Sequence, residues 1–103
     1  MKLIKKMSEM IEDEIKGAEC YIKKAIEYKE DKPELSRVFY SLSNDKMSIM
    51  ATLHDAVTDI IKEYRAEHGE PPEAMKAVYD YLHERQIDEA KEVKGLQAMY
   101  KEI

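Results

Sequence analysis

The chain has 103 residues, with 17 basic and 22 acidic side chains, so its formal net charge is −5. A chain of this length forms one domain with a thin hydrophobic core. Its hydrophobic content of 44% excludes a disordered protein, and its acidic balance argues against general nucleic-acid binding. Three Gly and three Pro are too few turn formers for a sandwich of many short strands.

Three helices are predicted from two breaks in the chain and from the spacing of the apolar residues. The first break ends at Pro33, and the second contains Gly69 followed by two prolines. Proline cannot continue a helix, and glycine favours the position just after a helix end. We therefore expect helices at about residues 2–28, 33–67 and 72–101, each with apolar residues three or four positions apart.

The predicted architecture is all-α: an antiparallel helical hairpin followed by a third long helix. Short connections make consecutive helices antiparallel, and three long helices leave apolar edges, so we expect an elongated bundle that is completed by homo-oligomerisation. The second helix has the longest apolar stripe. We expect its core face to comprise Leu35, Val38, Phe39, Leu42, Ile49, Met50, Leu53, Val57, Ile60, Ile61 and Tyr64.

The sequence predicts a cytoplasmic protein without a membrane partner. It has no run of 18 apolar residues, which a membrane span requires, and its N-terminus lacks the apolar region of a secretory signal. Cys20 is the single cysteine and cannot form an internal disulfide. It has no His at helical spacing, so we expect a structural thiol rather than a nucleophile.

Charged residues interrupt the apolar stripes at two places. Glu14 lies on the stripe of the first helix, and Asp45 and Lys46 interrupt that of the second. Charges are costly to bury unless they are paired or bind a metal. Three interpretations stay open: the side chains reach water at the edge of the interface, Glu14 and Lys46 form an internal ion pair, or a metal site is present. An internal pair predicts that Lys46→Met destabilises the fold by a few kcal/mol, on the order of the cost of an unpaired buried charge.

Several short motifs match the ferritin-like/rubrerythrin superfamily in their spacing. On the first helix, Glu14 is followed by Tyr21 and Ala25. On the second, the run 45–49 is followed by Leu53 and His54. The later segments 63–72 and 79–84 complete the similarity, which covers nearly the whole chain. The sequence thus resembles small ferritin-like proteins of Gram-positive bacteria and their prophages, and this implies a helical hairpin that in relatives carries a di-iron site.

The chain departs from the di-iron motif at two positions. Where the resemblance implies the Glu and the His of Glu-x-x-His, this sequence has Lys46 and Ile49. A protonated lysine has no lone pair, and isoleucine binds no metal. We therefore expect no cofactor. The alternative is a di-iron oxidase or iron-storage protein with an irregular site, whose candidate ligands are Glu14, Glu19, Asp45 and His54.

The remaining polar residues carry weaker hypotheses. Tyr40 and Tyr81 lie off the main stripes and are candidates for a subunit or partner surface, or for the edge of the core. His83 belongs to no metal-binding motif, and His68 lies next to Gly69 in the second break. The first helix is rich in carboxylates, which usually face solvent but could also meet a basic partner. These are Glu9, Glu12, Asp13, Glu14 and Glu19.

The preferred functional hypothesis is a non-catalytic ferritin-like protein that acts through protein–protein contacts. No Gly-rich phosphate loop and no serine with an orienting base are present in the sequence. The resemblance to prophage-carried proteins implies a phage-encoded protein directed at a host protein. The alternative is the iron protein described above, and a purely structural oligomer is a third possibility.

Overall fold

The computed structural model describes residues 2–103 and contains three helices, α1 (Lys2–Glu27), α2 (Pro33–His68) and α3 (Glu73–Glu102). The all-α class and the three helices are as predicted from the sequence. Pro33 occupies the first turn of α2, where its missing N–H costs no helical hydrogen bond. Gly69 ends α2 with φ of +76°, and its N–H donates to the Arg65 carbonyl at 2.9 Å.

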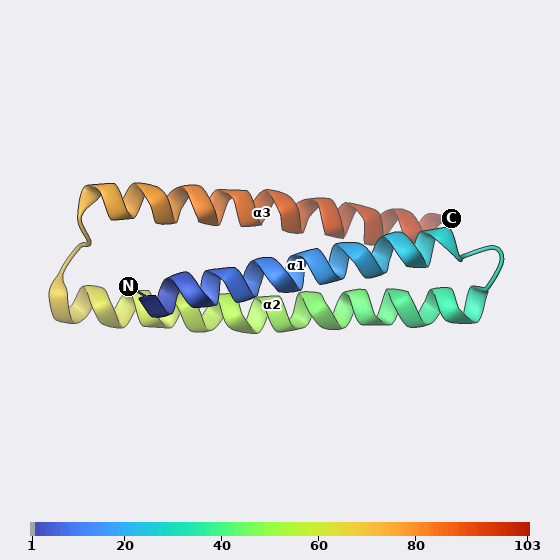
Figure 1. Ribbon diagram of the computed structural model, residues 1–103, viewed down its shortest axis with the longest axis horizontal. Coiled ribbons are helices and arrows are strands. Elements are labelled where there is room, and N and C mark those ends of the chain that lie inside the picture. The colour runs from blue at the N-terminus through green and yellow to red at the C-terminus, as the bar shows by residue number, and fades with distance from the viewer. Residues whose placement is uncertain (1) are drawn as a thin grey trace.

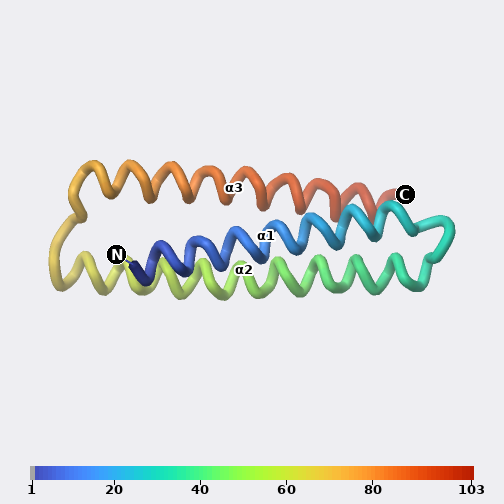
Figure 2. Tube along the Cα trace, in the orientation of Figure 1, coloured from blue at the N-terminus to red at the C-terminus, as the bar shows by residue number. Residues whose placement is uncertain are grey.

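The three helices form an elongated bundle that measures 55 × 19 × 18 Å. α1 and α2 are antiparallel, and α3 runs parallel to α1 (Figure 1). α1 packs against both other helices, whereas α2 and α3 make few direct contacts. At the end that holds the 69–72 connection, α2 and α3 extend beyond the start of α1 (Figure 2). No helix within residues 2–103 is long and apolar enough to cross a bilayer.

Small residues bring α1 and α2 close together. Ala18 and Ala25 of α1 are fully buried, as are Ser43 and Ser36 of α2. The Ser43 hydroxyl donates to the Ala18 carbonyl at 2.8 Å, and the Ser36 hydroxyl donates to the Ala25 carbonyl. The two contacts are seven residues apart on both helices, so they define one antiparallel register.

This register corrects the predicted core face of α2. Leu35, Val38, Leu42 and Ile49 were expected in the core but are exposed, with 36–52% of their surface accessible. The buried positions are Ser36, Ser43 and Met47. A hydroxyl that donates to a carbonyl of the neighbouring helix can be buried at little cost, and it permits an approach that leucine would prevent. Hydrophobic periodicity scores serine as polar, so it missed Ser36 and Ser43. Part of the predicted face does pack against the core, namely Phe39, Met50, Leu53 and Val57.

The contact between α1 and α3 has a second regular register. Gln86, Val93 and Tyr100 are the buried residues of α3, and they lie seven positions apart. Gln86 Nε2 donates to Ser8 Oγ at 2.8 Å across a separation of 78 residues. Val93 and Tyr100 pack in the same parallel order against the buried isoleucines of α1, in the core clusters that contain Ile15 and Ile22. The core of the protein is therefore built around α1.

Candidate protein-interaction groove

An open hollow of about 710 Å³ lies between α2 and α3. α1 forms its floor with Ile4, Ser8 and Ile11. The apolar and aromatic residues that α2 and α3 contribute are Val57, Ile61, Tyr64, Met75, Val78, Tyr79 and Leu82. A second hollow of about 280 Å³ shares Ile11, His54, His83 and Gln86 with the first. We call the two hollows together the groove, and the larger and smaller hollows its wide and narrow parts.

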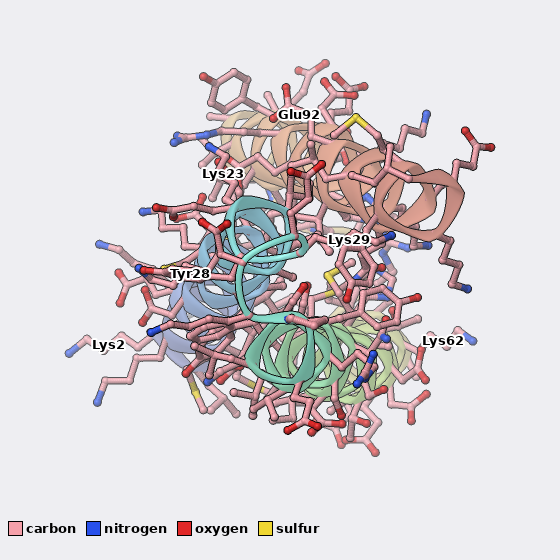
Figure 3. All side chains as sticks on the ribbon, turned by 90° about the vertical axis from the view of Figure 1, so that its right-hand side faces the viewer. Lys2, Lys23, Tyr28, Lys29, Lys62 and Glu92 are labelled. Carbon is pink, nitrogen blue, oxygen red and sulfur yellow. The ribbon has the colours of Figure 1, made fainter. Side chains whose placement is uncertain are left out.

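The groove exists because α1 packs on one side only of the α2–α3 pair. Viewed along the bundle, α1 lies to one side of α2 and α3 (Figure 3). A four-helix bundle would have a further helix beside these two. In this chain no helix of the described residues occupies that position. Val78 on α3 is consequently 56% exposed, although it lines an apolar hollow.

Basic residues line the wide part of the groove, whereas the chain as a whole is acidic. Asp80 is the acidic residue that lines the same part. Of these cations, all of them within residues 2–103, only Arg65 lies in an ion pair, with Glu70 at 3.5 Å. Both Lys62 and Lys2 extend outward from the bundle, Lys62 on the side opposite to α1 and Lys2 on the side of α1 (Figure 3). The basic residues are Lys2, Lys5, Lys62, Arg65 and Lys76.

His54 of α2 and His83 of α3 meet where the two parts of the groove join. Their Nε2 atoms are 3.1 Å apart, and the ring centroids are 5.2 Å apart with an angle of 18° between the planes. Asp55 Oδ1 lies 4.0 Å from the other ring nitrogen of His54. Sequence reasoning considered the two histidines separately and missed this pair. The one available signal was that both lie about three to four helical turns from the 69–72 connection.

Glu14 and Lys46 are brought together by the α1–α2 register. Lys46 Nζ lies 3.1 Å from Glu14 Oε2, and the side chains are 34% and 20% exposed. Oε2 is itself buried and accepts no well-formed hydrogen bond. The lysine stem crosses Gly17, where an added Cβ would lie 3.4 Å from Lys46 Cδ. This contact is therefore an ion pair at the edge of the helix interface, and the lysine remains in contact with water.

The four candidate iron ligands do not converge on one point. Glu14 faces Lys46, Glu19 pairs with Lys23 at 2.7 Å, and Asp45 is exposed. His54 faces His83 instead of a carboxylate from α1. Within residues 2–103 no group of three or more His, Cys, Asp or Glu side chains has the geometry to hold a metal ion. The residues present therefore do not fit a di-iron centre.

The two candidate interface tyrosines lie in different environments. Tyr40 stacks on Tyr100 with centroids 4.6 Å apart, so its ring is half-buried in its own chain. A hydrogen bond from Asn44, assisted by Lys101, lowers the pKa of Tyr40 below its ordinary value. Tyr81 is 64% exposed and is available to another molecule. Cys20, for which the sequence predicts a structural thiol, is exposed on α1.

No protein-family model, no curated protein and no solved structure matches this chain. What is established is therefore the fold, a small all-helical protein with three long helices. Any functional conclusion must come from the groove and its side chains.

Proposed function

We propose that this protein is a non-catalytic helical binding module, and that its partner is a protein that places an amphipathic helix with acidic flanks in the groove. The observation that carries this proposal is the apolar hollow between α2 and α3, which has α1 as its floor and is wide enough to be compared with the place of a fourth helix in a bundle. Helices bind such grooves through apolar residues at positions i, i+3, i+4 and i+7.

The charge of the groove argues for a partner of a different chain rather than a second copy of this one. A two-fold dimer through the groove would bring the same basic residues face to face. These include Lys5, Lys62 and Lys76, none of which has a carboxylate partner within the described chain. Cations around an apolar hollow instead favour a helix whose apolar stripe is bordered by Asp and Glu.

The resemblance to ferritin-like proteins belongs to the same proposal. In four-helix ferritin-like bundles, each hairpin packs against a second hairpin, so a chain with one hairpin and one further helix has room for a helix from elsewhere. If the resemblance to prophage proteins reflects descent, the helix comes from a host protein. Homo-oligomerisation through another surface, such as exposed Val38 and Leu42 of α2, is a separate expectation.

Selection from a peptide library tests the proposal even though the partner protein is unidentified. Randomised 20-residue peptides are displayed and selected on the immobilised protein, and the selected sequences are compared with the starting library. We expect an apolar stripe at helical spacing and an excess of Asp and Glu. Enrichment of basic or extended sequences, or no enrichment, would contradict the proposal.

A matched pair of variants locates the binding surface. Ile61→Glu puts a charge into the wide part of the groove, and Val38→Glu puts the same charge on an exposed apolar position of the same helix. Peptide binding should be lost in the first variant and kept in the second, with circular dichroism showing that both are folded. Light scattering on both variants tests whether a second copy of this chain occupies the groove instead. A dimer that dissociates in Ile61→Glu but not in Val38→Glu would show that it does.

A further inference from the structure

We infer that His54 and His83 form a two-imidazole site for a divalent transition metal ion of the Zn²⁺, Ni²⁺ or Cu²⁺ class, which ties α2 to α3 across the groove. This site is separate from the iron ligands suggested by the ferritin-like resemblance, because neither Glu14 nor Asp45 takes part. It also does not depend on the proposed binding of a partner helix.

The distance between the two rings matches that of a chelating pair. A metal ion bound at about 2.0–2.1 Å from each nitrogen, with a coordination angle between a right angle and the tetrahedral value, needs nitrogens about 2.9–3.4 Å apart. The two Nε2 atoms are 3.1 Å apart. Both histidines can therefore ligate one ion without a large movement of either helix.

The surroundings of His54 favour the ligating tautomer. The Asp55 carboxylate lies 4.0 Å from Nδ1 and electrostatically favours a proton on that nitrogen. The lone pair is then on Nε2, which faces His83. Asp55 occupies the far side of the imidazole, where metal-bound histidines commonly have a carboxylate, although at 4.0 Å and 87% exposed it is a neighbouring charge and not a hydrogen-bond partner. His83 Nε2–H then donates to His54 Nε2, and a bound metal ion displaces that proton so that both nitrogens ligate the ion.

The site is open to solvent, so an ion can enter and water can complete its coordination. The His54 side chain is 42% exposed, and both rings line both parts of the groove. Imidazole is a good ligand for zinc, copper and nickel, whereas calcium and magnesium prefer oxygen. The other charged groups that line the narrow part are Asp55, which favours a bound cation, and Lys91 and Lys94, which oppose it.

The chain provides its own control, because its third histidine, His68, lies 59% exposed beside Glu67 at the end of α2. Untagged protein is titrated with ZnCl₂ and, separately, NiCl₂, by calorimetry and by thermal unfolding. We expect one saturable site per chain and a higher melting temperature that EDTA reverses. His54→Ala and His83→Ala should each weaken binding at least tenfold, while His68→Ala should leave it unchanged.

Nuclear magnetic resonance of the imidazole nitrogens gives a second measurement on the unmodified protein. Zinc should shift the Nε2 resonances of His54 and His83 together, leaving those of His68 in place. The inference is overturned if no saturable binding is found, if binding survives His54→Ala or His83→Ala in folded protein, or if His68 is the residue that responds.

Discussion

The hydroxyl of Tyr100 lies 3.0 Å from the hydroxyl of Ser36, and this contact links the end of α3 to the first turn of α2. Ser36 also donates to the Ala25 carbonyl of α1, so Tyr100 is the donor between the two hydroxyls. Lys29 Nζ lies 4.3 Å from the centroid of the Tyr100 ring and donates to its carbonyl. All three helices therefore meet at one buried tyrosine.

Tyr100→Phe should lower the free energy of unfolding by about 1 kcal/mol, the usual net contribution of one hydrogen bond. The ring and its stacking on Tyr40 are kept in this variant, so the loss isolates the hydroxyl. Urea unfolding measures the change. Tyr81→Phe is the matched control, because Tyr81 is 64% exposed, and it should have no effect. Equal stability of the two variants would show that the Tyr100 hydroxyl contributes nothing.

Lys46→Met should destabilise the fold by about 1 kcal/mol, because it removes the cation that faces the buried Oε2 atom of Glu14. This is less than the few kcal/mol expected for an internal pair, since the Lys46 side chain is 34% exposed. Lys23→Met serves as the control, because Lys23 and Glu19 form a more exposed pair. An unchanged midpoint of urea unfolding in Lys46→Met would show that the Glu14–Lys46 pair is energetically silent.

Gly95→Ala should stabilise the protein by about 1 kcal/mol, because alanine is the better residue inside a helix. An added Cβ at position 95 meets no atom within 4 Å, so the gain is not offset by a clash. Gly69→Ala should instead lower the stability by about 1 kcal/mol, because residue 69 has φ of +76°. Thermal unfolding of the two variants should show shifts of opposite sign.

Tyr40 should ionise below the ordinary tyrosine pKa, because Asn44 and Lys101 favour its phenolate. A folded-state pKa below the unfolded value adds stability that is complete above the unfolded pKa and disappears as the pH falls through the folded pKa. In an absorbance titration of the tyrosines, the phenolate that forms at the lowest pH should be absent from Tyr40→Phe. Asn44→Ala should move that step to higher pH, and a titration that Asn44→Ala leaves unchanged would contradict this assignment.

The groove could be anticipated in part. The wide apolar stripes predicted that the helices carry more apolar surface than the core of one chain can bury. Ile61 and Tyr64, which belong to the predicted stripe of the second helix, line the open hollow. The position of the groove depends on which face of α2 is covered by α1. That face is set by the hydrogen bonds of Ser36 and Ser43 to α1, and hydrophobic periodicity scores these two residues as polar. The His54–His83 pair required the geometry of the α2–α3 connection as well.

By itself the sequence determined the helical class, the three helices and their approximate ends, because periodicity, proline and glycine act locally along the chain. The apolar spacing of the first helix also matches the residues that α1 buries. Only the tertiary structure decided which residues of α2 are buried, since that depends on how closely α2 approaches α1. Two serines that bond to carbonyls of α1 turn α2 so that Leu35 and Val38 face outward. The same packing leaves α2 and α3 apart, with an apolar groove between them that is bordered by basic residues. It also brings His54 of α2 into contact with His83 of α3.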